Sequence, residues 1–325
     1  DARTLYDGHK IKILNVDEGG NVIFLVYGYM NRGRHEGNVG VAVYGYNSMT
    51  NTGEERLYIP YDKSYELLKT DIDKLSYINR NGIYYFMIDG TVYGVNLETL
   101  ACQSVVTGLR EGGYHVSDSN KMLVWQEGSD LYAGTRLVLM NLSTQTQTQI
   151  DAGADEYISV LGFMDEDLIY GLAKKNDVLV NYTGITTFPM YELRIQSDEG
   201  DVLKTYHKDN VFVVGSEIQE NQLNLSRVVF DEESGSYEAV SDDQIMSTEE
   251  VKTGSNTIGY VTTEAYETIC QIVVKNEIDG KSMLRLSPKE VLFEGDRAVR
   301  TPGTDVMEPR FYVYGKNGIE GIYVN

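Results

Sequence analysis

The feature that most constrains the fold is a polar turn that occurs twice at a fixed spacing. Asn96-Leu97-Glu98-Thr99 and Asn141-Leu142-Ser143-Thr144 each follow a short apolar segment and precede another strand-like segment. Equivalent positions lie 45 residues apart (141 − 96 = 45). A strand–turn–strand unit that recurs about every 40–50 residues is typical of chains built from repeated small sheets. The spacing therefore predicts a repeat architecture made of strands.

Short apolar segments with a period of two, or with no polar interruption, run through the whole chain. They lie at residues 21–27, 40–46, 83–88, 122–125, 167–172, 210–214, 257–262, 269–274 and 310–314. Segments of this length between turn residues are typical of strands. Asp89-Gly90, directly after the third segment, indicates a tight hairpin. The best helix candidate is the short stretch 63–69, so the sequence predicts an all-β protein.

The outer hairpin turns give a repeat count. We expect them near Thr50, Glu98, Ser143, Asp198, Glu233 and Asp279, at intervals of 48, 45, 55, 35 and 46 residues. Together they predict a single β-propeller domain over residues 1–325 with at least six blades. A seventh blade closed by both termini is favoured by expected strands at 291–293, 310–314 and 321–324, together with 3–6 from the other end. Six blades are the alternative, and a pair of stacked sheets does not explain the 45-residue recurrence.

Composition agrees with strands and limits the partners. Tyr (25) and Gly (32) are abundant while Pro (5) and Trp (1) are scarce, which favours strands and tight turns. The net charge of −21 repels phosphate backbones and so argues against nucleic-acid binding. No apolar run approaches the ~20 residues of a transmembrane helix.

Two further features concern the redox state and the cellular location. Cys102 and Cys270 lie outside any metal-binding spacing, so we expect two free thiols rather than a disulfide or a zinc site. The chain begins at Asp1 without Met, which is consistent with removal of an N-terminal signal or anchor. We therefore expect an extracytoplasmic protein, secreted or membrane-anchored through the removed segment.

Three segments carry a family resemblance. Residues 116–126 followed by 137–144 show a polar turn, a strand, a short gap, a second strand and an Asn-Leu-x-Thr/Ser-type turn, and residues 162–170 resemble the inner part of the same unit. This order resembles repeats of TolB-like and WD40-like bacterial β-propellers. More weakly, the chain is similar to the propeller part of larger envelope proteins of Gram-positive bacteria. The resemblance implies the fold and no particular activity.

One loop has the densest set of chemically useful side chains. Arg32-Gly33-Arg34-His35-Glu36-Gly37 places two cations, an imidazole and a carboxylate between glycines in an otherwise acidic chain. Such a local cationic site can hold a carboxylate or a sulfate. We therefore predict Arg32, Arg34, His35 and Glu36 as ligand- or partner-binding residues. The alternative is a solvated hairpin loop whose Arg and Glu side chains pair with each other.

The common catalytic and cofactor motifs are absent from the sequence. There is no Gly-x-Ser-x-Gly, no phosphate-binding glycine loop and no His-Glu-x-x-His, so no catalytic residue, cofactor or metal is predicted. The acidic groups at 165–167, 231–233 and 242–243 are interpreted as solvated turns rather than Ca²⁺ sites. The many tyrosines fit packing between blades better than a ligand-stacking surface.

These observations favour a non-enzymatic scaffold that binds a protein or a cell-envelope ligand such as cell-wall carbohydrate. The alternative is a carbohydrate-active enzyme that uses carboxylates at the mouth of the propeller. A third possibility is one module of a larger protein, whose activity lies elsewhere.

Overall fold

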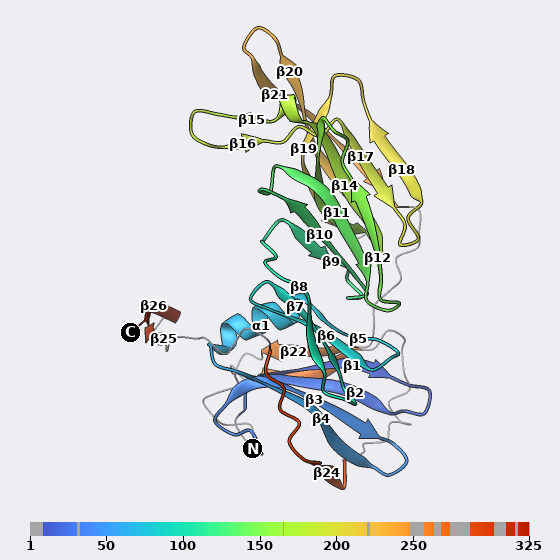
Figure 1. Cartoon of the computed structure of the whole chain (residues 1–325), viewed down its shortest axis with the longest axis vertical. Helices are drawn as coiled ribbons and strands as arrows, with labels where there is room; N and C mark the ends of the chain where they lie inside the picture. Colours follow the sequence, from blue (N-terminus) through green and yellow to red (C-terminus); the bar gives the residue numbers. More distant parts are fainter. Residues whose placement is uncertain are drawn as a thin grey trace. The chain divides into compact units, whose positions relative to one another are not determined.

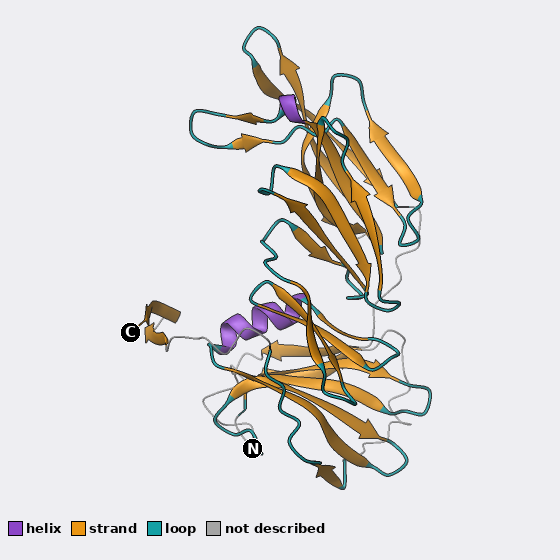
Figure 2. Cartoon of the chain, viewed as in Figure 1, coloured by secondary structure: helices purple, strands orange, loops and turns teal. Residues whose placement is uncertain are grey.

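Strands make up most of the regular secondary structure of the computed structural model (Figure 2). It describes residues 9–30, 33–164, 166–219, 222–247 and 287–301, and the backbone of strands at 257–262, 268–273, 310–315 and 318–324. The chain divides into two compact units. Unit 1 comprises residues 1–69, 92–105 and 286–325, and unit 2 comprises residues 70–91 and 106–285.

Unit 1 contains a sheet built from both ends of the chain. Strands β1 (His9–Val16), β2 (Val22–Tyr29), β3 (Val39–Asn47) and β4 (Thr52–Tyr61) form an antiparallel meander. Strand β24 (Glu290–Leu292) extends this sheet by pairing in parallel with β4. Most buried side chains of the sheet are apolar: Leu25, Val41, Val43, Leu57 and Ile59 lie on one face, and Ala42 and Tyr58 lie on the other. Successive side chains of a strand point to opposite faces, so both faces of this sheet are packed.

The segment after β24 continues along β4. The Tyr58 amide donates to the Arg297 carbonyl (3.0 Å), and the Val299 amide donates to the Tyr58 carbonyl (2.8 Å). The strand predicted at 291–293 is therefore confirmed as β24 with a shifted boundary. The partner strand predicted at 3–6 lies outside the described residues.

The next elements are a helix and a four-stranded sheet. Helix α1 (Tyr65–Lys74) extends the predicted helix at 63–69 and buries Leu68 and Ile72, which are four residues apart. Strands β5 (Ser76–Ile78), β6 (Ile83–Ile88), β7 (Thr91–Asn96) and β8 (Cys102–Val106) are hydrogen-bonded in that order. Asp89 and Gly90 have φ of 51° and 67°, so the predicted tight hairpin is confirmed.

Unit 2 continues with two more four-stranded antiparallel sheets (Figure 1). The first contains β9 (Tyr114–Val116), β10 (Met122–Gly128), β11 (Gly134–Asn141) and β12 (Thr146–Asp151). The second contains β13 (Glu156–Met164), β14 (Asp167–Lys174), β17 (Glu192–Gln196) and β18 (Val202–His207). Between β14 and β17 lie a short helical turn, η1 (Lys175–Asp177), and a small hairpin, β15 (Leu179–Val180) with β16 (Thr186–Thr187).

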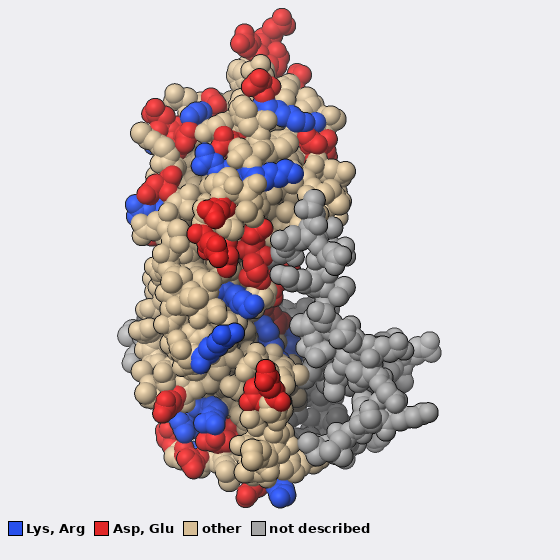
Figure 3. Space-filling view, turned by 90° about the vertical axis from the view of Figure 1, so that its right-hand side faces the viewer, with Lys and Arg blue, Asp and Glu red and all other residues tan. Residues whose placement is uncertain are grey.

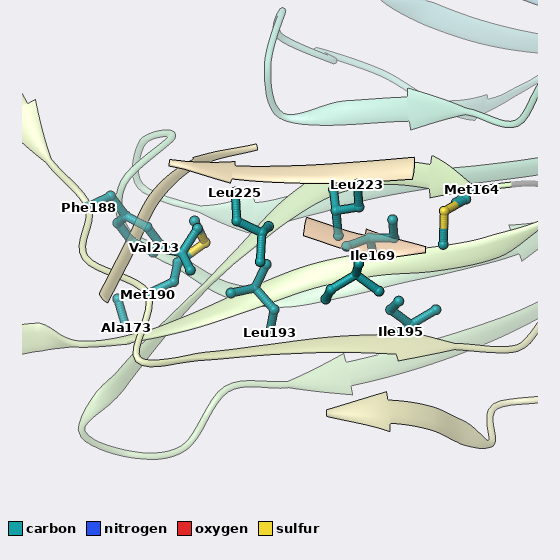
Figure 4. Close-up of a cluster of buried hydrophobic side chains, with 11 residues drawn as sticks. Met164, Ile169, Ala173, Phe188, Met190, Leu193, Ile195, Val213, Leu223 and Leu225 are labelled. Atoms are coloured by element: carbon teal, nitrogen blue, oxygen red, sulfur yellow. The ribbon is translucent and has the colours of Figure 1, made fainter. Parts of the chain in front are cut away.

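The remaining strands form smaller groups. Strands β19 (Phe212–Gln219), β20 (Gln222–Asp231) and β21 (Ser236–Met246) make a three-stranded sheet. The pairs β22 (Thr257–Thr262) with β23 (Thr268–Val273), and β25 (Arg310–Gly315) with β26 (Gly318–Val324), are antiparallel. Figure 4 shows how residues of β13, β14, β17, β19 and β20 bring Ile169, Leu193, Leu223 and Leu225 into one buried cluster.

A recurring turn joins the last two strands of several sheets. The side-chain oxygen of Asn96 accepts the amides of Glu98 and Thr99, both at 2.9 Å. Asn47, Asn141 and Asp231 repeat this arrangement at the ends of β3, β11 and β20. A side chain that satisfies two turn amides explains why an amide or carboxylate residue recurs there.

Five of the six predicted outer hairpins are confirmed. They join β3 to β4, β7 to β8, β11 to β12, β17 to β18 and β20 to β21. The sixth, near Asp279, lies outside the described residues. The all-β class with small antiparallel sheets is therefore correct, while the seven-blade count, the single domain and ring closure stay predictions.

Candidate functional site

The β2–β3 loop of unit 1 is the loop predicted to bind a ligand. Its ends are joined by two backbone hydrogen bonds: the Met30 amide donates to Asn38, and the Gly37 amide donates to Met30, both at 2.8 Å. The Asn38 side chain also donates to the His35 carbonyl at 3.3 Å. These bonds fix the backbone from which Arg34, His35 and Glu36 project.

His35 points inward. Its Nε2 lies 2.7 Å from Oε2 of Glu55, a residue of β4 that is 1% exposed. The imidazole stacks flat on the ring of Tyr58, with centroids 3.5 Å apart and an angle of 6° between planes. The imidazole therefore supplies a hydrogen-bonding partner for a buried carboxyl group and anchors the loop to β4.

A β-bulge explains how Glu55 and Tyr58 reach the same imidazole. Residues three apart on a regular strand point to opposite faces. In the β3–β4 pair, Val43 is opposite Leu57 but Tyr44 is opposite Glu55, so Arg56 is an extra residue. The bulge turns the Glu55 side chain to the face that carries Tyr58.

Two tyrosines complete the surroundings of Glu55. The Tyr44 hydroxyl donates to Glu55 Oε2 at 3.4 Å. Burial, followed by the negative charge of Glu55, raises the pKa of Tyr44 to about 12. The same two causes raise the pKa of Tyr58. The buried Tyr58 hydroxyl has no hydrogen-bond partner within the described part of the chain. Both phenols therefore remain neutral at physiological pH.

Arg34 instead lies at the surface, next to the segment that follows β24. Its Nη2 donates to the Gly295 carbonyl at 3.1 Å, and its guanidinium carbon lies 5.5 Å from the centre of the Phe293 ring. Among the described residues, Arg34 and Glu36 form no ion pair with each other or with another side chain. Within the part of the chain that the structure describes, the Arg34 charge is therefore positioned but not neutralised.

The end of β24 and the residue after it also expose apolar side chains. Val291, Leu292 and Phe293 are 45%, 39% and 43% exposed. In addition, β24 is the last strand in the order of its sheet, so within the described residues its outer edge has no strand partner. We call Arg34 together with Val291, Leu292 and Phe293 the edge surface. The edge surface combines the positive charge of Arg34, exposed apolar side chains and the backbone hydrogen-bonding groups on the outer edge of β24.

The structure places only some of the predicted loop residues at the surface. Arg34, His35 and Glu36 lie together on one loop, but only Arg34 and Glu36 face outward, and Arg32 lies outside the described residues. Whether the loop binds a ligand stays a prediction.

Sequence reasoning missed three residues of the site: Glu55, Tyr44 and Phe293. Glu55 stands between two other charged residues, Glu54 and Arg56, and nothing in that run marks it as the buried one. Glu55 and Tyr44 reach the loop through the register and bulge of the β3–β4 pair, and Phe293 reaches it because β24 pairs with β4; the sequence displays neither.

The acidic groups behave as turn and surface residues where they are described. Asp231 caps a turn, and Asp243 accepts from Lys208 and from Arg227 (3.1 Å). No group of three or more potential metal ligands occurs among the described residues. Acidic and basic side chains are mixed on the face shown in Figure 3.

Two remaining expectations concern the thiols and the membrane. Cys102 is a free thiol, as predicted, and the side chain of Cys270 lies outside the described residues. In the described segments, no helix is long and apolar enough to cross a membrane.

The fold and the site together define an all-β chain of consecutive antiparallel meanders with a cationic, apolar edge. No protein-family model matches the sequence, and no curated protein matches it. Among solved structures, the chain is similar to the β-propeller domain of the Trilobed protease from Pyrococcus furiosus. The identity is 11% and the TM-score is 0.32, over 77% of this chain and 75% of that one.

Two enzymes show a similar level of likeness. An oligogalacturonate lyase from Vibrio parahaemolyticus has 12% identity and a TM-score of 0.28, over 86% of this chain and 88% of that one. A post-proline cleaving enzyme from Rickettsia typhi has 8% identity and a TM-score of 0.31, over 84% of this chain and 46% of that one. With scores this low, the superpositions carry no conclusion about fold or activity.

Proposed function

We propose that the protein is a non-enzymatic, extracytoplasmic binding scaffold whose edge surface holds an extended acidic segment of a partner protein. The observation that carries the proposal is Arg34, a cation held in place without an anionic partner among the described residues. A carboxylate of the partner supplies the missing charge, and a charge-assisted hydrogen bond there contributes about 1.5–3 kcal/mol.

The outer edge of β24 supports an extended shape for the bound segment. A peptide that adds a strand to a sheet edge gains main-chain hydrogen bonds, and alternate side chains then face the sheet surface. The exposed Phe293 side chain provides an apolar contact beside Arg34, and the exposed Val291 adds apolar area on β24. An acidic segment with interspersed apolar residues matches this combination. A propeller of seven blades, with a TolB-like or WD40-like repeat order, is the architecture we propose for the scaffold.

A carbohydrate-active enzyme is the second candidate in principle. Glycoside cleavage uses two accessible carboxyl groups on either side of the bond, but Glu55 is 1% exposed and its Oε2 is bonded to His35 and Tyr44. The geometry therefore supports a structural role for the His35–Glu55 pair better than a catalytic one.

The test uses defined peptides and purified protein. A fluorescent peptide alternating Glu and Val is titrated with the protein, and anisotropy is recorded; a peptide alternating Lys and Val is the control ligand. We expect Arg34→Ala to weaken binding about tenfold or more, since 1.4 kcal/mol corresponds to a factor of ten. Lys204→Ala, an equal charge change on β18, should leave affinity unchanged. Equal binding of both peptides would overturn the proposal.

The location is tested separately. External protease added to intact cells should digest the protein if it is extracytoplasmic, while a cytosolic marker survives. Protection equal to that of the marker would contradict this part of the proposal.

A further inference from the structure

Unit 2 contains a surface pocket that the proposed function does not use. Its volume is about 340 Å³, within the range of about 300–1,000 Å³ that holds small ligands. Its walls come from two segments: residues 106–113, which start at the last residue of β8, and residues 125–131, which run from the end of β10 into the following loop. It is therefore formed by one local part of the chain.

Both walls are held by hydrogen bonds that involve backbone amides. The Leu109 amide donates to Gly90 (2.9 Å), and the Gln126 amide donates to Gly113 (2.8 Å), which ties the first wall to β10. In the second wall, the Tyr132 amide donates to the Asp130 carboxylate at 2.8 Å. The pocket is thus preformed, which lowers the entropy cost of binding.

The lining combines an aromatic side chain with groups of both charges. Trp125, the only tryptophan of the chain, contributes to it, as do Arg110, Glu127 and Asp130. Arg110 forms no ion pair among the described residues. A guanidinium donates hydrogen bonds and carboxylates accept them, so the lining suits a ligand whose groups do both.

The side-chain oxygen of Gln126 is a hydrogen-bond acceptor that no donor of the described residues reaches. Its Nε2 donates to the Leu131 carbonyl at 3.0 Å, which fixes the orientation of the side chain. Its Oε1 is buried and has no hydrogen-bond partner in the described structure. A buried acceptor of this kind is costly unless a donor reaches it. A hydroxyl group entering the pocket is such a donor.

We propose that this pocket binds a short saccharide of one or two pyranose rings. Sugar hydroxyls donate to the carboxylates and to Gln126 and accept from Arg110, and the apolar face of a ring packs against an aromatic side chain. The pocket shares no residue with the edge surface, and this proposal does not depend on the proposed function.

The test uses the emission of Trp125, which is the only indole and therefore reports on the pocket. Maltose, chitobiose and digalacturonate are titrated separately, with calorimetry as a second measurement. We expect at least one saccharide to shift the emission in a saturable way. Arg110→Ala should weaken this binding about tenfold or more. Lys121→Ala, an exposed charge outside the pocket, and Arg34→Ala should leave it unchanged.

The saccharide that binds most tightly shows which groups of the pocket recognise the ligand. Preference for digalacturonate identifies Arg110 as a carboxylate partner, while preference for a neutral sugar identifies hydroxyl recognition; either supports the pocket. Release of shorter sugars also supports it and points to Glu127 and Asp130 as catalytic groups. No binding by calorimetry up to about 10 mM, or binding unaffected by Arg110→Ala in a folded variant, overturns the proposal.

Discussion

The imidazole of His35 lies 2.7 Å from the carboxylate of Glu55, a group that is almost completely removed from solvent. The pair joins a loop between two strands to the interior of the next strand. Removing one partner of such a pair leaves a buried polar group that water cannot reach, so losing one partner destabilises the protein far more than losing a surface contact would.

His35→Ala should lower the free energy of unfolding by about 3 kcal/mol, the lower end for breaking a buried pair, because Tyr44 still donates to Glu55. Urea denaturation followed by fluorescence measures the change. Glu36→Ala, on the same loop but exposed, should change stability by less than about 0.5 kcal/mol. The double variant His35→Phe with Glu55→Leu should recover part of the loss. A His35→Ala protein as stable as the parent would refute a structural role for the pair.

Tyr44 should make the protein sensitive to alkali. Its pKa is raised from 10.0 to about 12 in the folded state by burial and by Glu55. The folded protein therefore keeps the proton when the unfolded chain has lost it, and stability falls as pH rises from about 10 to about 12. Tyr44→Phe should flatten this part of the pH profile. The difference in phenolate absorbance between parent and variant measures the titration, and a midpoint near 10 would contradict the expectation.

Gly40 is required by close packing beside the site. A Cβ at this position would lie 2.6 Å from the Ile59 carbonyl and 2.9 Å from the Tyr58 hydroxyl. Gly40→Ala should therefore cost about 1–3 kcal/mol through overpacking, measured by thermal unfolding. The matched control is Gly215→Ala on β19, where the nearest contact is the Ser226 Cβ at 3.6 Å. That variant should be neutral or slightly stabilising, so equal effects of the two changes would exclude a packing cause.

Two substitutions in the recurring turn at Asn96 should change the stability of the protein in opposite directions. Asn96→Ala removes two hydrogen bonds to turn amides and should destabilise by about 1 kcal/mol. Leu100, the last turn residue, has a φ of 61°, which a leucine rarely adopts. Leu100→Gly relieves that conformation, at a cost in unfolded-state entropy, and should stabilise by about 0.5 kcal/mol. Chemical denaturation measures both, and shifts of the same sign would argue against the turn geometry.

The sequence predicted those features that depend on local chemistry. Alternating apolar residues, the Asp89-Gly90 hairpin and the turn at Asn96 act over a few residues, and each is present in the structure. The helix at 63–69 was also correct, although α1 starts later and is longer. Such features need no knowledge of what packs against them.

The candidate site could be predicted only in part, because its parts meet through distant pairing. The bulge at Arg56 decides where Glu55 points, and an extra residue in a strand leaves no mark on the apolar pattern. Likewise, Phe293 reaches Arg34 only because β24 pairs with β4. The hydrogen bond from Arg34 to Gly295 joins residues 261 positions apart, and a contact over that separation cannot be read from one sequence.

The parallel pairing of β24 with β4 also has a consequence during synthesis. Glu290 is opposite Thr52, so 238 residues (290 − 52) separate the partners. At about 5–20 residues per second, a ribosome needs roughly 10–50 s to make that interval. Throughout that time the edge of β4 that β24 will cover lacks this partner on every nascent chain. Nascent chains on neighbouring ribosomes of one messenger RNA therefore expose the same backbone groups to one another. Chaperone binding near residues 52–54 would protect these groups until β24 emerges.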